Sequence, residues 1–128
     1  MRLLLDTNVL VRFVEGRLNR DLRDALAASG AEVQISVANL WEIAIKVRLG
    51  KLPLRVSPED LPAFIDSVGF ALLTIKAPHV LADVDPEPPT RDPFDRLLLA
   101  QCSVEGLQLV TLDRALAAHP LSWRQVKA

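Results

Sequence analysis

The sequence predicts an α/β protein, a single three-layer α/β/α domain with a central, mainly parallel sheet. Short apolar runs alternate with helix-like segments, as expected of parallel strands joined by crossover helices. The first run, RLLLD, is apolar without alternation, which is typical of a strand buried on both faces. A chain of 128 residues, half of them apolar, can form one core, so we expect residues 1–128 to be one domain.

Strands are predicted where apolar residues run together between turn signals, and helices where they recur every three or four positions. The predicted strands are 2–6, 32–36, 70–75 and 107–112, with an edge strand at 122–126. The predicted helices are 7–16, 19–30, 37–50, 57–69, 77–84, 93–105 and 113–119. In the fourth helix, Ser57, Pro58 and Asp60 predict a capping box at the start.

The composition excludes several classes of protein. The net charge of −1 does not indicate nucleic-acid or membrane binding, so any basic surface must be local. No apolar run is long enough to span a bilayer, and the first residues lack the pattern of a secretion signal. The single cysteine, Cys102, fits a reducing compartment, and with only two histidines a structural zinc site is not expected. We therefore expect a cytoplasmic protein that does not bind membranes.

Four acidic residues from four separate segments are expected at one edge of the sheet. Asp6 ends the first strand, Asp113 follows the fourth, Glu42 lies early in the helix after the second, and Asp95 lies in the first turn of the helix before the fourth. Ligands of such sheets bind beyond the carboxyl ends of the strands. Four carboxylates gathered there repel one another and raise at least one pKa, and a divalent cation removes that cost. Oxygen ligands alone indicate Mg²⁺ or Mn²⁺.

Each of these acids also has a purely structural interpretation. Asp6 and Asp113 can cap the helices that they precede. Glu42 can pair with Lys46 one helical turn later. Taken singly, the structural interpretation is at least as good as the functional one, but four acids at one edge exceed what capping requires.

Four motifs occur in order along the chain: LLLDTNVL, ISVANLWEIAIKVRLGKL, RDPFDRLLLAQ and LVTLDRAL. Together they resemble the PIN-domain ribonucleases and, more closely, the VapC-type toxins of bacterial toxin–antitoxin pairs. The similarity runs from Arg2 to about Leu116. It implies a PIN-like fold and an endoribonuclease dependent on Mg²⁺ or Mn²⁺, which hydrolyses RNA phosphodiester bonds with metal-activated water.

The resemblance also implies a role for each acid. The family's quartet of catalytic and metal-binding acids, which bind directly or through water, matches Asp6, Glu42, Asp95 and Asp113. Supporting polar groups are expected at Thr7, Thr111 and Ser36. Two positions depart from the family pattern, because Thr90 stands where many relatives have a histidine and Leu112 where a charged residue is frequent. Neither departure removes an acid.

The segment TRDPFDRLLLAQC contains two aspartates three residues apart at the start of a helix. Asp92 and Asp95 can be the N-cap and the third helical residue, with Pro93 at the first helical position. Combined with the resemblance, this spacing favours Asp92 as the cap and Asp95 as the residue that faces the metal. Whether Asp92 also assists the site stays open.

RNA, an antitoxin protein and a second copy of the chain are the partners that the resemblance implies. Arginines on segments near the acidic edge are candidates for phosphate contacts, although each can equally be solvated. They are Arg12, Arg17, Arg91, Arg96 and Arg114. Two sets of apolar residues can line a groove for the antitoxin, or simply belong to the core. They are Leu10, Phe13 and Val14 in one helix, and Trp41, Ile45 and Leu49 in another.

Two other functions compete with the nuclease. A binding module with the same fold and no catalysis is the first, although the complete set of acids argues against it. A phosphatase that uses Asp6 as its nucleophile is the second. Enzymes of the haloacid dehalogenase type need another acid two positions later, where this chain has Asn8.

Overall fold

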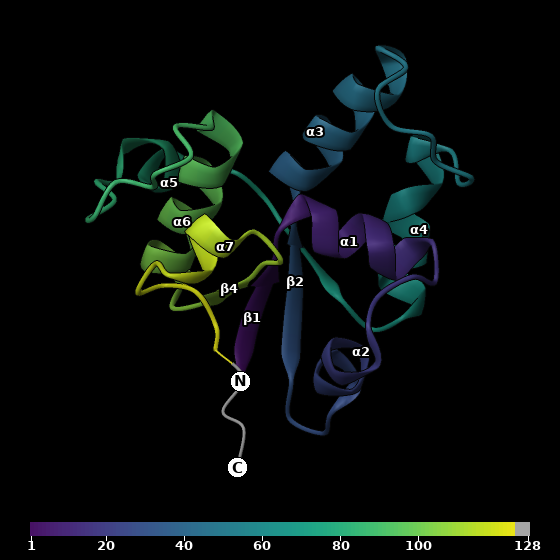
Figure 1. The fold of residues 1–128 in the computed structure, drawn as a ribbon, viewed down its shortest axis with the longest axis horizontal. Helices are drawn as coiled ribbons and strands as arrows, with labels where there is room; N and C mark the ends of the chain where they lie inside the picture. The colour runs from purple at the N-terminus through teal and green to yellow at the C-terminus, as the bar shows by residue number, and fades with distance from the viewer. Residues whose placement is uncertain (125–128) are drawn as a thin grey trace.

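Four parallel strands form the centre of the protein, with helices on both faces (Figure 1). The computed structural model describes residues 1–124. The strands are β1 (Arg2–Leu5), β2 (Glu32–Ser36), β3 (Ala71–Leu73) and β4 (Gln108–Val110), and they lie in the order β3-β2-β1-β4. All three pairings between neighbouring strands are parallel. The predicted α/β class is confirmed, and the sheet is parallel throughout these four strands.

Seven α-helices surround the sheet within residues 1–124. They are α1 (Thr7–Val14), α2 (Arg20–Ala27), α3 (Val37–Arg48), α4 (Leu61–Ser67), α5 (Ala77–Leu81), α6 (Pro93–Glu105) and α7 (Arg114–Ala117), with a 3₁₀ turn η1 (Pro58–Asp60) before α4. In Figure 1, α1, α2 and α4 lie on one side of the sheet and α5, α6 and α7 on the other. None of these helices is long and apolar enough to cross a membrane.

The central strand β1 is buried on both faces. Leu3 and Leu5 belong to a core that includes Ile65 of α4, whereas Leu4 belongs to a second core that includes Leu98 of α6. All three leucines of β1 are completely buried. Successive side chains of a strand point to opposite faces, so β1 contributes to both cores and the two layers of helices pack against it.

The order of the strands positions the site. The chain runs from β1 outward through β2 to β3 and then returns to place β4 on the other side of β1. The direction of winding therefore reverses between β1 and β4, and this is where α/β sheets form ligand crevices. Asp6 follows β1 directly, and its backbone N–H donates to the carbonyl of Val110 at the end of β4, at 2.9 Å.

The structure corrects the sequence prediction in two segments. The predicted helix 57–69 is split into η1 and α4, and the Ser57 hydroxyl contacts Glu59 instead of capping the backbone, so the predicted capping box was wrong. The predicted edge strand is a single parallel bridge between Leu109 and Ser122. Its last part, residues 125–126, lies outside the described residues. The remaining elements were predicted correctly: β2 and α6 have their predicted bounds, and the others are shorter than predicted by one to four residues.

Candidate metal-binding and active site

Asp6 lies at the centre of the carboxyl edge and is 6% exposed. One carboxylate oxygen, Oδ1, accepts from the backbone N–H of Thr7 at 2.8 Å and caps α1. The other, Oδ2, accepts from the hydroxyl of Thr111 after β4, also at 2.8 Å. Burial raises the pKa of Asp6, and the charges of Glu42 and Asp113 raise it further, against the effect of these hydrogen bonds. Asp6 therefore both caps α1 and forms part of an acidic cluster.

Glu42 is held at the same edge by a chain of buried hydrogen bonds. Its Oε1 accepts from the Thr7 hydroxyl at 2.6 Å, and Thr7 in turn accepts from the side-chain amide of Asn39 at 3.0 Å. The carbonyl oxygen of the same Asn39 side chain accepts from the backbone N–H of Ser36 at 2.8 Å. Ser36 caps α3, so the chain connects the start of that helix with the first residue of α1. Glu42 is 7% exposed and depends on this network for its position.

The second oxygen of Glu42 pairs with a lysine. Lys46 Nζ donates to Glu42 Oε2 at 2.7 Å, from one turn further along α3. The ion pair that the structural interpretation predicts between Glu42 and Lys46 is therefore present. It does not exclude the functional interpretation, because the charge of Glu42 also raises the pKa of Asp6 and of Asp95.

The two aspartates at the start of α6 have the different local positions that were predicted for them. Asp92 Oδ1 accepts from the backbone N–H of Phe94 at 2.8 Å, which makes Asp92 the N-cap. Asp95, in the first turn, is half-buried. Burial raises the pKa of Asp95 to about 6, and the charges of Asp6, Asp92 and Glu42 add to the increase, while a hydrogen bond from Thr90 opposes it. Asp95 therefore lies within the electrostatic reach of the other acids.

Asp113 is an exposed residue and caps α7. Its Oδ1 accepts from the backbone N–H groups of Ala115 and Leu116, at 2.8 and 3.2 Å. Its backbone N–H donates to the Thr111 hydroxyl, the same group that binds Asp6. The charge of Asp113 raises the pKa of Asp6. Asp113 is thus attached to the edge of the acidic cluster.

These carboxylates suit a hard divalent cation by their chemistry. The donor set consists of carboxylate and hydroxyl oxygens, and burial, with a smaller contribution from mutual repulsion, raises the pKa of Asp6 and of Asp95; a cation would relieve both costs. In the conformation described for residues 1–124, no three Asp, Glu, His or Cys side chains are arranged as a metal cage. Glu42 instead forms an ion pair with Lys46, and Asp113 caps the N-terminus of α7. The chemistry of the donors therefore fits a divalent cation, although the described side chains do not form a complete set of ligands for one.

Two of the candidate arginines line a hollow beside the start of α6. The hollow has a volume of about 650 Å³, and Arg91, Asp92 and Arg96 contribute to its wall. Arg96 pairs with Glu87 at 3.2 Å, whereas Arg91 is exposed and has a left-handed backbone with φ of 55°. A positive φ is strained for a residue with a side chain, so the backbone is constrained at Arg91, just before α6 begins.

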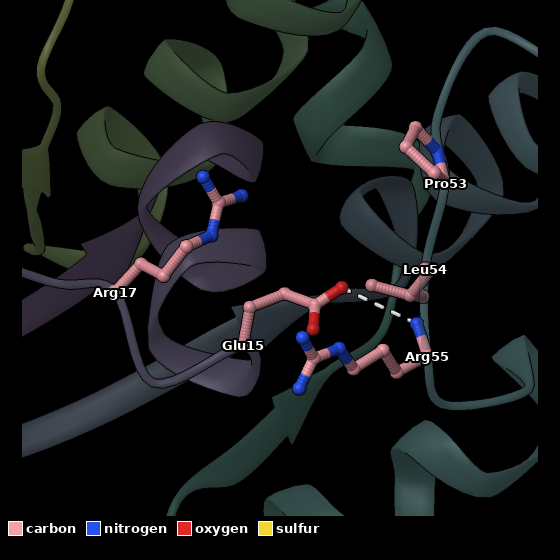
Figure 2. A pocket seen from close by; sticks show the side chains of 5 residues that line it. All are labelled: Glu15, Arg17, Pro53, Leu54 and Arg55. Atoms are coloured by element: carbon pink, nitrogen blue, oxygen red, sulfur yellow. Dashed lines mark hydrogen bonds between the residues drawn. The ribbon is translucent and has the colours of Figure 1, made fainter.

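A second pocket lies at the opposite end of α1 from Asp6 (Figure 2). Glu15 and Arg17, which follow α1, and the segment Pro53–Arg55, which follows α3, line this pocket of about 560 Å³. The backbone N–H of Arg55 donates to Glu15 Oε1 at 3.2 Å. None of the four candidate acids lines this pocket, and Arg17 belongs to it rather than to the acidic edge.

The other two candidate arginines are exposed, whereas both histidines are buried. Arg12, in the last turn of α1, and Arg114, at the start of α7, are exposed. His79 is buried, and its Nε2 is 2.8 Å from Glu105 Oε2. His119 is also buried, and its Nε2 is 2.7 Å from the carbonyl oxygen of Pro86. Both histidines connect separate segments of the fold, and neither contacts one of the four candidate acids in the described residues.

Two features of this edge were not predicted from the sequence: the hydrogen bonds of Asn39 and the contact between Trp41 and Phe94. Asn39 is completely buried and links Ser36 to Thr7; its position three residues after Ser36, as in a capping box, was the available signal. Trp41 is 59% exposed and packs edge-to-face on Phe94, with 5.4 Å between ring centroids. This contact joins α3 to α6, the two helices that carry Glu42 and Asp95.

Comparison with known proteins gives the family. The model of the PIN domain matches residues 3–120, so the chain belongs to the PIN domain family, whose members are generally nucleases. No curated protein matches the sequence. Among solved structures, a toxin-antitoxin complex from Klebsiella pneumoniae has a similar fold, with a TM-score of 0.64 and 21% sequence identity, over 94% of this chain and 95% of that one. The resemblance seen in the sequence motifs is confirmed at the level of the family.

Proposed function

We propose that this protein is an endoribonuclease dependent on Mg²⁺ or Mn²⁺ and the toxin of a toxin–antitoxin pair. The observation that carries the proposal is the acidic edge of a PIN-domain sheet, where Asp6 is buried at the reversal of winding and electrostatically coupled to Glu42 and Asp113. Asp95 joins the same cluster from α6. Carboxylates that repel one another at a ligand crevice support metal-assisted hydrolysis of a phosphodiester.

The residues would share the work as follows. Asp6 and Asp95 would hold the ion, with Glu42 and Asp113 binding directly or through water. When bound, a divalent ion lowers the pKa of water and stabilises the negative charge on a leaving oxygen. Thr111 donates to Asp6 and so fixes the direction in which its carboxylate points. Cleavage by water leaves a 5′-phosphate and a 3′-hydroxyl.

Contacts with RNA are proposed on either side of the acids. Arg91 is exposed and lines the hollow beside α6. Arg96 would contribute positive charge from the same hollow, although Glu87 holds it there. Arg12 and Arg114 are exposed and available for phosphates. These four side chains would supply local positive charge that the overall net charge of −1 does not reveal.

The toxin role and the antitoxin partner rest on the family motifs and on the fold shared with the toxin-antitoxin complex from Klebsiella pneumoniae. Of the two apolar sets considered for a partner groove, the one in α1 is disfavoured because Leu10 is completely buried in the core. The set in α3 is the better candidate, because Trp41 and Leu49 are 59% and 61% exposed at helical spacing. A homodimer remains part of the proposal.

RNA cleavage tests the nuclease directly. We expect cleavage by the parent chain with Mg²⁺ or Mn²⁺ and none with a chelator, and a loss of roughly 100-fold or more in Asp6→Asn and Asp95→Asn, the scale for removing one charged group from a site. Asp24→Asn, an exposed acid on α2, is the matched control and should cleave like the parent. Circular dichroism confirms that each variant is folded. Equal cleavage by parent and both site variants would reveal a contaminating nuclease and refute the proposal.

Growth after induced expression tests the toxin role separately. The parent chain should arrest growth, and Asp6→Asn should relieve the arrest at the same expression level, because the acid is needed for RNA cleavage. Normal growth with the parent chain, in a strain that lacks an antitoxin, would contradict the toxin role and leave the nuclease to be judged by the cleavage assay. A folded parent that binds RNA without cleaving it would instead favour a catalytically silent binding module.

A further inference from the structure

Both oxygens of the Glu42 side chain are engaged in this structure. Oε1 accepts from Thr7, and Oε2 accepts from Lys46 at 2.7 Å. The carboxylate side chain is 9% exposed and that of Lys46 is 43% exposed, so the ammonium group covers the carboxylate on its open side. A metal ion that binds Glu42 directly through Oε2 would have to displace Lys46.

Acids on other elements also act electrostatically on the ammonium group of Lys46. The hydrogen bond to Glu42 is the main cause that raises the pKa of Lys46, against its partial burial, and the charges of Asp92 and Asp6 raise it further. Asp6 follows β1 and Asp92 precedes α6, so Lys46 interacts with acids from three separate segments. Its ammonium group therefore supplies positive charge beside the acids through its contact with Glu42.

We propose that Lys46 is the internal counter-ion of the acidic edge and competes with the divalent metal for Glu42. This inference rests on the proposed function, because it concerns the same metal site. In the absence of metal, the ammonium group neutralises part of the repulsion between the carboxylates. In its presence, the positive charge of Lys46 opposes the incoming ion, so the site fills only at a higher metal concentration than the carboxylates alone would require.

The energy of the pair sets the size of the effect. Lys46 is too exposed for a large interaction, and exposed ion pairs contribute up to about 1 kcal/mol, which corresponds to about fivefold in a binding constant. Arg48 is two residues further along α3 and exposed, so it offers the same charge on the same helix at a different azimuth. Comparing the two positions separates the specific contact from a general change in net charge.

Titration with Mn²⁺ alone, followed by electron paramagnetic resonance without RNA, tests the competition. We expect Lys46→Met to bind Mn²⁺ about fivefold more tightly than the parent, since one opposing positive charge is removed. Arg48→Met should change the affinity much less, and Lys46→Arg, which keeps the charge, should remain close to the parent. Weaker or unchanged binding in Lys46→Met would overturn the proposal.

Thermal unfolding gives a readout that does not depend on activity. In chelator, Lys46→Met should have a lower Tm than the parent, because Glu42 loses its partner. At saturating Mn²⁺ this difference should narrow or reverse, because the metal takes over the charge compensation and stabilises the folded state. An equal loss of Tm with and without Mn²⁺ would show that the pair is only structural.

The two levels of the proposal fail in different ways. If the parent does not bind Mn²⁺, or if Asp6→Asn does not abolish the binding, the metal site itself is refuted. The role of Lys46 as its counter-ion is then refuted as well. If the parent binds Mn²⁺ at a site that depends on Asp6 and Lys46→Met binds no more tightly, only the role of Lys46 is refuted. The nuclease assay then stands independently.

Discussion

At the scale of single residues, the main property of the site is the energetic cost of ionising carboxylates that are close together and partly buried. Asp95 shows this clearly, since burial raises its pKa to about 6 and three neighbouring acids contribute to the increase. Asp6 is shifted in the same direction by burial, Glu42 and Asp113. The hydroxyls of Thr90 and Thr111 oppose these shifts, and they keep the carboxylates ionisable and oriented.

The pH dependence of stability follows from the sign of the Asp95 shift. Its pKa is higher in the folded state, so its contribution to stability is complete below the unfolded value of 3.8 and is lost as pH rises to about 6. In chelator, Asp95→Asn should therefore gain Tm over the parent as the pH increases from about 4 to about 6, and keep this gain at pH 7.5. Thermal unfolding across this range measures the difference.

Asp66→Asn is the control for this series, because Asp66 is an exposed acid on α4. Its Tm relative to the parent should stay flat between pH 4 and 7.5. A flat difference for Asp95→Asn as well would contradict the burial of a charged Asp95 at the acidic edge.

At the scale of secondary-structure elements, the starts of helices carry the site. Asp6, Ser36, Asp92 and Asp113 are the N-caps of α1, α3, α6 and α7, respectively. Capping and function are therefore not alternatives here. The caps fix where each helix begins at the carboxyl edge, and this places Asp95 in the first turn of α6 and Glu42 in the second turn of α3.

The role of Asp92 can be separated from that of Asp95 by two substitutions. Asp92→Ala should lower the free energy of unfolding by about 1 kcal/mol, because the N–H of Phe94 loses its acceptor. Asp92→Ser keeps a capping oxygen and should remain close to the parent. Denaturation with urea measures both. If serine costs as much stability as alanine, the carboxylate acts through its charge rather than as a cap, and RNA cleavage by the serine variant then shows whether it assists the site.

At the scale of the whole molecule, the sheet divides the interior into two cores joined by β1. Leu3 and Leu5 pack on one side and Leu4 on the other, and all are completely buried. Asp6 is attached directly to the end of this strand, so the rigidity of the double core determines how firmly the acid is held. The position of β1 between β2 and β4 also brings Asp6 to Thr111.

Truncation of Leu4 tests this central role. Leu4→Ala should lower the free energy of unfolding by about 2–5 kcal/mol, the range for removing a fully buried leucine side chain. Leu81→Ala, at a position 79% exposed, should change it by less than about 0.5 kcal/mol. Urea denaturation compares the two variants. A small loss for Leu4 would mean that the interior can close around the missing side chain and that β1 does not anchor the site.

Local patterns were sufficient to predict much of this protein. The alternation of apolar runs and helical segments predicted the α/β class, and the residues around each helix start predicted the caps at Asp6, Asp92 and Asp113. The spacing of Glu42 and Lys46 predicted their ion pair. These features were accessible because each depends on residues a few positions apart. Ser57 shows that a local motif is not always sufficient. The residues of a capping box are present there, but the Ser57 hydroxyl donates to Glu59 instead of capping the backbone.

Only the tertiary structure decided how these parts meet. The hydrogen bond from Thr111 to Asp6 spans 105 positions, and that from Thr7 to Glu42 spans 35, so no sequence period encodes either. Strand order placed β4 beside β1, and burial then shifted the pKa values of Asp6 and Asp95. By itself, the sequence determined which residues carry charge and, except at α4, where the helices begin. Folding determined which charges lie together, because electrostatic repulsion and desolvation depend on distance in space and not on distance along the chain.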